Sequence, residues 1–86
     1  MIDVNHNIAD KAANFSAEQC RGARAMLGWS QDDLARAASV ARQTIADFER
    51  GARTPIANNI LAIVNALERA GIEVLRNNGI LLRKSS

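Results

Sequence analysis

Polar side chains able to read nucleic acid bases gather in the segment ARQTIADFER, residues 41–50. If this segment is a helix, Gln43 and Asp47 form one row on its surface, and Arg42 and Arg50 lie in the neighbouring row. Arg42 can make two hydrogen bonds to guanine, Gln43 can make two to adenine, and Asp47 can accept one from the amino group of cytosine. These residue types therefore predict hydrogen bonding to base edges in the major groove of duplex DNA.

Further residues near this segment suit contact with the DNA backbone. Ala41 is small and lets a helix come close to the bases, whereas Gln31, Arg50 and Arg53 are placed to hold phosphates. The predicted DNA-binding residues are Gln31, Ala41, Arg42, Gln43, Thr44, Asp47, Arg50, Arg53 and Thr54. A polar helix face can also be merely solvated, so the prediction depends on the elements that surround it.

Residues 30–51 have the pattern of two short helices joined by a tight turn. Ser30 is a typical N-cap residue with acidic residues behind it, which predicts a helix over 31–38. Ser39 lies in the turn, and the second helix covers 41–50 and ends at the following glycine. The side chains expected to hold the two helices together are Leu34, Ala35, Val40, Ile45 and Phe48. Their inward position leaves the polar face of 41–50 turned outward.

Two further helices are predicted around this pair. Ser16 and Gln19 form a capping box that begins a helix over 16–27. Pro55 begins a fourth helix over about 56–70, whose apolar stripe is expected to face the core. The stripe consists of Ile56, Ile60, Ile63, Val64 and Leu67.

The segment after the fourth helix changes from a helical period to a strand pattern. Asn78 and Gly79 stand between two apolar runs, which is typical of a β-hairpin with a two-residue type I′ turn. The pairs expected from that turn are Leu75 with Leu82 and Glu73 with Lys84. The apolar residues then divide between one face with Leu75, Ile80 and Leu82 and another with Ile72, Val74 and Leu81. A longer loop over 76–79 would shift this register.

The expected domain organisation follows from these elements. Residues 1–15 show no sustained period and are interpreted as a flexible N-terminal arm or at most a short helix, and residues 16–71 form the DNA-binding domain. Residues 72–84 form the hairpin. A lone hairpin is marginal in water, so one face should cover the helices, and the other face or the free edge is a candidate dimerisation element.

Composition excludes several classes of protein. The chain has 86 residues and a net charge of +2, which is too weakly basic to indicate nucleic acid by itself. One cysteine, Cys20, and one histidine, His6, allow no internal disulfide and no metal site of these residue types. No apolar run approaches the roughly 20 residues that cross a bilayer, so no membrane partner and a cytoplasmic location are expected.

The stretch SQDDLARAASVARQTIADFERG, residues 30–51, resembles the helix-turn-helix signature of lambda-repressor-like, Cro-like transcription regulators, the XRE family. The resemblance covers about residues 18–70. It implies a mainly α fold, a compact bundle of four or five helices with helix 41–50 in the major groove. The short C-terminal β-hairpin predicted from the residue pattern is added to this bundle. The resemblance also implies an ion pair between Arg24 and Glu49. The family commonly has glycine where this chain has Ser39.

The family resemblance also implies a homodimer on a near-palindromic operator. The function predicted is therefore a sequence-specific regulator that binds double-stranded DNA, acting as a homodimeric repressor. An antitoxin, or an adaptor that uses the same domain while its hairpin binds a toxin or another protein, is the alternative. No enzyme and no cofactor are expected, because the chain has no Ser/His/Asp set, no Gly-rich phosphate loop and no paired carboxylates in a predicted cleft.

Overall fold

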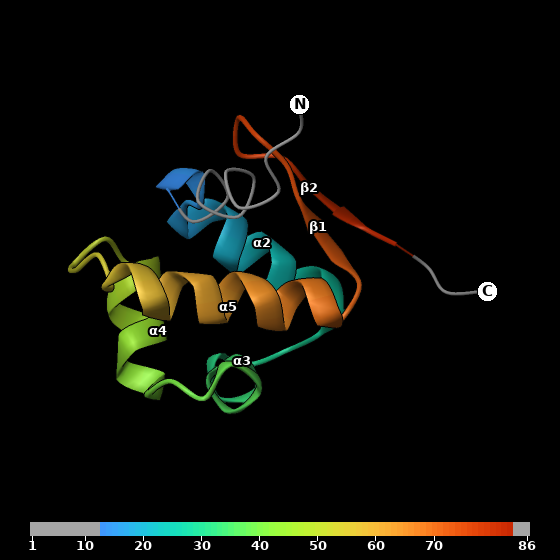
Figure 1. Ribbon diagram of the computed structural model, residues 1–86. Helices are drawn as coiled ribbons and strands as arrows, with labels where there is room; N and C mark the ends of the chain where they lie inside the picture. Colours follow the sequence, from blue (N-terminus) through green and yellow to red (C-terminus); the bar gives the residue numbers. More distant parts are fainter. Residues whose placement is uncertain (1–12, 84–86) are drawn as a thin grey trace.

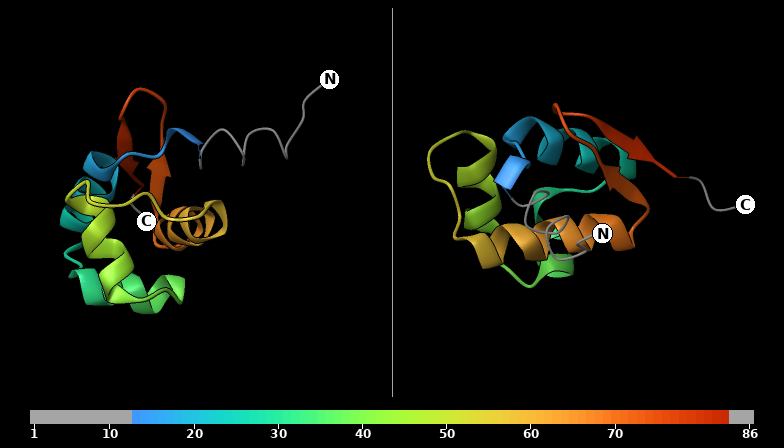
Figure 2. Two further views of the ribbon diagram at one scale, coloured as in Figure 1. Left: turned by 90° about the vertical axis from the view of Figure 1, so that its left-hand side faces the viewer. Right: turned by 45° about the horizontal axis from the view of Figure 1, so that its top comes forward.

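Four helices and then two short strands follow one another along residues 13–83, the part of the chain that the computed structural model describes. The elements are α2 (Ala17–Leu27), α3 (Gln31–Ala38), α4 (Arg42–Glu49), α5 (Ala57–Arg69), β1 (Ile72–Val74) and β2 (Ile80–Leu82). Helix α5 crosses the middle of the molecule, with α3 and α4 at one end and the hairpin at the other (Figures 1 and 2). The predicted fold class, mainly α with a C-terminal hairpin, is confirmed.

Helix ends lie where the local chemistry predicts them. The Ser16 hydroxyl accepts the Gln19 amide N–H at 3.0 Å, and the Gln19 side chain accepts the Ser16 N–H at 2.9 Å. Ser30 and Asp33 form the same reciprocal pair at the start of α3, at 3.0 and 2.9 Å. Each pair satisfies two backbone N–H groups that a helix start leaves without partners, so both capping serines determine where their helices begin.

Ser39 adopts the left-handed conformation in the turn between α3 and α4, with φ 58° and ψ 43°. The Val40 N–H donates to the carbonyl of Ala35 at 3.0 Å, and the Ser39 N–H donates to that of Arg36 at 3.3 Å. This is the bond pattern of a Schellman helix end, which favours glycine at the left-handed position. The turn therefore keeps the geometry for which the family commonly uses glycine, although this chain has serine there.

The core lies between α5 and the other elements. Leu34 from α3, Ile45 from α4, and Ile63 and Leu67 from α5 are fully buried. Phe15 and Phe48 stack with ring centroids 5.8 Å apart, and both are buried. The aromatic pair places residue 15 in the core rather than in the arm to which the sequence assigns it. Residues 13 and 14, also assigned to the arm, are helical, and the rest of the arm prediction concerns residues 1–12, which lie outside the described residues.

Ile56 corrects the predicted core stripe of the fourth helix. Four of the five stripe residues are buried, but the Ile56 residue is 69% exposed. It is the N-cap of α5, with φ −62° and ψ 156°, so its backbone is extended and its side chain does not follow the helical period. The stripe therefore begins one turn later, at Ile60.

The predicted hairpin is present, but its register is wrong. Ile72 pairs with Leu82, Glu73 with Leu81, and Val74 with Ile80. The strands are joined over residues 75–79, the longer loop that the sequence left open, and the left-handed residues are Asn77 and Asn78 rather than Asn78 and Gly79. Ile72, Val74, Ile80 and Leu82 consequently share the inward face, while Leu81 lies on the outward face with 49% exposure.

Gln19 of α2 explains why the longer loop is adopted. Its buried side-chain amide donates hydrogen bonds to the carbonyls of Leu75 and Gly79, at 2.7 and 2.8 Å. A Cβ on Gly22 would lie 2.8 Å from the end of the Ile80 side chain, so the hairpin packs closely on α2 as well. These contacts connect residues more than fifty positions apart, and they select a loop that local turn preferences do not.

Candidate nucleic-acid interface

Helix α4 presents its polar side chains away from the core. Ile45 and Phe48 are buried against the other helices, whereas Arg42 and Gln43 are exposed at the start of α4. Ala41 is the exposed N-cap and makes no side-chain cap bond, so the first N–H groups of α4 have no partner from that side chain. Two of the three predicted base-reading residues, Arg42 and Gln43, therefore stand together at the start of a helix whose other side is held by the core.

Asp47 lies at the centre of this surface and accepts two side-chain hydrogen bonds. Its Oδ1 atom accepts from Gln43 Nε2 at 2.9 Å and from Arg50 Nη2 at 2.8 Å. The hydrogen bonds from Gln43 and Arg50 hold the pKa of the Asp47 carboxyl below its ordinary value, so the group stays ionised at neutral pH. Three of the predicted site residues are therefore bonded to one another before any DNA is present.

A shallow depression of about 350 Å³ connects α4 with the loop before α5. Five predicted site residues line it: Gln43, Thr44, Asp47, Arg53 and Thr54. Pro55, Ile56 and Asn59 complete the lining and were missed by the sequence reasoning, which placed Ile56 in the core. The missed signal is the position of Ile56 directly after the proline, because the residue before the first helical turn does not follow the helical stripe.

Gln31 is the one predicted site residue that the structure joins to the interior. Its Nε2 atom donates to Glu49 Oε1 at 3.1 Å, and the residue is half-buried. Arg42, Arg50, Arg53 and Thr54 are exposed, and Thr44 is half-buried. The structure thus brings the predicted residues onto the surface formed by α4, the start of α3 and the loop before α5.

Comparison with known protein families gives a match over this region. A family model described as helix-turn-helix matches residues 21–73, which is more than half of the chain. The chain belongs to this helix-turn-helix family. The matched residues run from α2 into β1 and include α3, the Ser39 turn and α4. Comparison with curated proteins gave no match.

Membership of the helix-turn-helix family confirms the resemblance to lambda-repressor-like, XRE-type regulators. The matched region is a DNA-binding domain of a transcription regulator, and α4 lies within it. None of the helices within residues 13–83 is long and apolar enough to cross a membrane.

A buried ion pair holds the helix-turn-helix unit against α2. Arg24 Nη2 and Nε donate to the two carboxylate oxygens of Glu49, each at 2.7 Å, so the pair expected from the resemblance is present. Gln31 donates to one of these oxygens, and the Cys20 thiol donates to the other at 3.0 Å. Arg21 also donates to the backbone carbonyl of Glu49. One carboxylate therefore joins side chains from α2, α3 and α4.

The pKa values in this cluster follow from burial and hydrogen bonding. Burial alone would raise the pKa of Glu49, but hydrogen bonds from Arg24, Cys20 and Gln31 hold it below its ordinary value of 4.5. Burial and then the neighbouring Glu49 carboxylate raise the pKa of the Cys20 thiol. The thiol is therefore a neutral hydrogen-bond donor inside the helix-turn-helix domain rather than a reactive thiolate.

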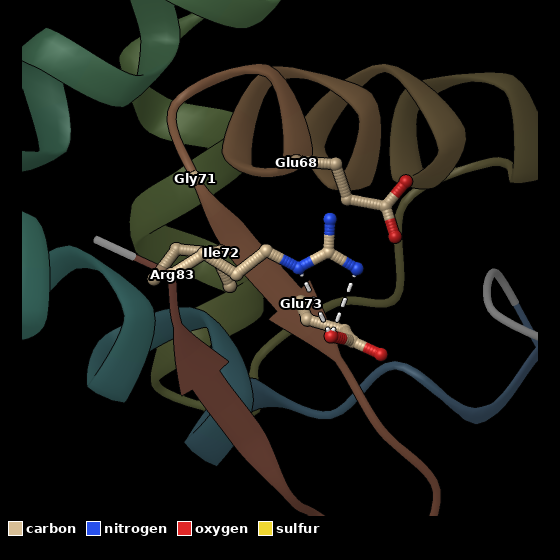
Figure 3. A pocket seen from close by; sticks show the side chains of 5 residues that line it. All are labelled: Glu68, Gly71, Ile72, Glu73 and Arg83. Atoms are coloured by element: carbon tan, nitrogen blue, oxygen red, sulfur yellow. Dashed lines mark hydrogen bonds and ion pairs between the residues drawn. The ribbon is translucent and has the colours of Figure 1, made fainter. Parts of the chain in front are cut away.

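A second depression lies at the base of the hairpin, far from α4. It has a volume of about 300 Å³ and is lined by Glu68, Gly71, Ile72, Glu73 and Arg83. Figure 3 shows the Arg83 guanidinium beside the Glu73 carboxylate, with Glu68 extending from α5 toward the same place. Arg83 donates to Glu73 Oε1 at 3.0 and 3.2 Å. This exposed pair lies on the outward side of the hairpin and joins its two strands.

Proposed function

We propose that this protein is a sequence-specific regulator of transcription that binds double-stranded DNA in the cytoplasm and represses its target as a homodimer. In this proposal α4 enters the major groove of a near-palindromic operator. The outward polar face of α4, with Arg42 and Gln43 exposed at its first turn, is the observation that carries the proposal. A groove about 12 Å wide accepts one helix that offers such side chains at its start.

Individual residues take different roles in this proposal. Arg42 and Gln43 contact base edges, and Ala41 and Thr44 lie at the closest approach of the helix to the groove. Arg50, Arg53 and Thr54 contact phosphates at the end of α4 and in the loop after it, and Gln31 contacts a phosphate from the start of α3. Phosphate contacts position the domain without reading the sequence, so the two groups of residues have separable effects.

Selection of binding sites from a pool of random duplexes tests the proposal directly. The full chain is expected to enrich one short motif, present as two inverted half-sites. A flat pool after selection, in which no base is preferred at any position, would contradict sequence-specific reading.

Arg50→Ala and Arg53→Ala should each make DNA affinity less dependent on salt. Each phosphate contact releases a condensed counterion, so the slope of log affinity against log salt concentration should become less negative by about 1 in each variant. Titration of a fixed duplex at several salt concentrations measures the slope. Arg69→Ala, which removes the same charge from an exposed position at the end of α5, should leave the slope unchanged. Equal slopes for the wild type and all three variants would remove Arg50 and Arg53 from the phosphate-contacting set.

The hairpin is the proposed dimerisation element. Its outward face carries Leu81, which is 49% exposed, beside the Glu73–Arg83 pair, and Leu75 in the connecting loop is 41% exposed. The hairpin lies at the opposite end of the molecule from α4, so contact with a second copy there does not cover the recognition helix (Figure 2). Apolar side chains on the outward face of a two-stranded sheet favour association with another chain.

Leu81→Glu should therefore shift the chain from dimer to monomer at micromolar concentration, as measured by sedimentation equilibrium. Asn65→Glu, which adds the same charge at an exposed position of α5, is the matched control and should stay dimeric. A wild-type chain that is monomeric under these conditions would contradict self-association through the hairpin.

The same exposed leucines favour the second candidate function, an antitoxin or adaptor. That candidate gains support if the monomeric chain binds a small toxic protein encoded by an adjacent gene and Leu81→Glu abolishes the binding.

A further inference from the structure

The amide of Gln43 has only one orientation that bonds to Asp47. An ionised carboxylate accepts hydrogen bonds and cannot donate them, so the Gln43 amide must turn its nitrogen toward Asp47. The observed bond, from Gln43 Nε2 to Asp47 Oδ1 at 2.9 Å, has this orientation. Glutamine amides otherwise present oxygen and nitrogen interchangeably, because a rotation of the amide plane exchanges the two. The carboxylate one helical turn later therefore determines which way the Gln43 amide points.

The hydrogen bond to Asp47 leaves free the two groups of the Gln43 amide that a paired contact with adenine requires. A primary amide has two N–H bonds and one carbonyl oxygen, and Asp47 uses only one N–H. The second N–H and the oxygen remain for a paired contact, in which the nitrogen donates to adenine N7 and the oxygen accepts from adenine N6. Guanine presents two acceptors at the same edge, so it cannot satisfy an amide whose oxygen is held in this place.

The positive charge of Arg50 offsets the negative charge of Asp47 on the surface that would face DNA phosphates. The Arg50 Nη2 atom donates to the same Asp47 oxygen at 2.8 Å from the other side. The Asp47 side chain is only 16% exposed, while the Arg50 side chain is 66% exposed. The positive charge therefore stands outside the negative one, and the pair as a whole presents an arginine to the DNA backbone.

We propose that Asp47 is a positioning residue that makes Gln43 selective for adenine, rather than a direct reader of cytosine. The inference rests on the proposed function, since it requires α4 in the major groove. The Asp47 carboxylate then acts on DNA recognition through Gln43. This role replaces the direct contact with cytosine that the residue type alone predicts.

The test compares base preferences of the wild-type chain, Asp47→Asn and Asp32→Asn in the same selection from random duplexes. Asp32 pairs with exposed Arg36 on α3, so its replacement changes the net charge equally without touching Gln43. Wild type and Asp32→Asn should prefer adenine over guanine roughly tenfold at one position of each half-site, as expected for a two-bond contact. Asp47→Asn should reduce that preference at least about threefold at this position alone, because an asparagine amide can accept or donate and leaves Gln43 free to turn over.

The Gln43→Ala variant identifies which base-pair position of the half-site Gln43 contacts. This variant should lose the adenine preference at one position, and adding Asp47→Asn to it should change nothing further there. An unchanged preference in Asp47→Asn, at a position that Gln43→Ala has identified, overturns the role of Asp47 while the proposed function stands. A wild-type selection without any enriched motif overturns the proposed function, and this inference with it.

Nuclear magnetic resonance of the free protein supplies a readout that general loss of structure would not mimic. The two Nε2 protons of Gln43 should have separate, pH-insensitive shifts at neutral pH in the wild type and should move toward solvent-exposed amide values in Asp47→Asn. The Nε2 protons of Gln19, which are bonded in the interior, should keep their shifts in the same spectrum. A change in both glutamines would indicate a disturbed fold and would contradict the local role.

Discussion

Arg24→Met is expected to lower the free energy of unfolding by about 3 kcal/mol at pH 7. The substitution keeps most of the side-chain volume but removes both hydrogen bonds from Arg24 to the Glu49 carboxylate. The Glu49 side chain is 3% exposed, so its charge would remain inside the protein without the cation that balances it. Removing one partner of a buried ion pair costs more than the pair contributes, because the other charge is left uncompensated.

The pH dependence of this destabilisation separates the charge effect from the packing effect. In the wild type the pKa of Glu49 lies below 4.5, so its contribution to stability is present above pH 4.5 and is lost as the pH falls through the lower, folded value. Without Arg24, burial dominates and should raise the folded pKa of Glu49 above 4.5. The variant should then gain stability as the pH falls through that raised value toward 4.5, so the difference from wild type should narrow on acidification.

Urea unfolding at pH 7 and at pH 4.5 measures both quantities. Arg36→Met is the matched control, because it removes an arginine that pairs with Asp32 and Asp33 on the surface. That variant should be destabilised by less than about 1 kcal/mol, with little change between the two pH values. A destabilisation in Arg24→Met no larger than in the control, or one independent of pH, would contradict a buried charge network at Glu49.

Arg42→Ala is expected to weaken discrimination at one base pair of each half-site by roughly 1–3 kcal/mol. Arg42 is exposed at the first turn of α4, and among residues 13–83 its guanidinium makes no hydrogen bond that would have to break before binding. A guanidinium that contacts guanine makes two bonds at a fixed spacing, and no other base presents the same two acceptors. The substitution should therefore relax the preference for guanine at that position.

Competition binding with duplexes that differ at single base pairs measures this effect. Arg69→Ala removes the same charge at the end of α5, outside the predicted DNA-binding residues, and should leave every base preference unchanged. Stability should be unchanged in both variants, because both side chains are exposed. A uniform decrease of affinity in Arg42→Ala, with every base preference intact, would make Arg42 a phosphate contact.

Local chemistry accounts for the parts of the fold that the sequence predicted well. Ser16 and Ser30 begin helices because each side chain bonds to a backbone N–H three residues later. Gly51, with φ 77°, ends α4 because a left-handed residue closes a helix most easily when it has no side chain. These interactions span only a few residues, so the sequence contains all the information that they need.

The hairpin register was not predictable in this way, whereas the position of Ile56 was predictable from Pro55 but was missed. Asn78 and Gly79 fit a tight turn locally, but the bonds from Gln19 to the loop favour a wider connection. Ile56 continues the apolar spacing of the fourth helix in the sequence, but the helix begins after it. Its side chain lines the depression next to α4. In the hairpin, hydrogen bonds from Gln19, which is distant in the sequence, therefore favour one of two connections that the local sequence permits.

The sequence by itself determined the helix ends, the two-helix motif and the outward polar face of residues 42–50, because periodicity and capping act over one or two helical turns. The tertiary structure decided which polar side chains already form hydrogen bonds within the protein. Gln31 is bonded to Glu49, and Gln43 and Arg50 are bonded to Asp47. Hydrogen bonding between side chains depends on rotamers and on the packing of neighbouring helices, which spacing alone does not specify.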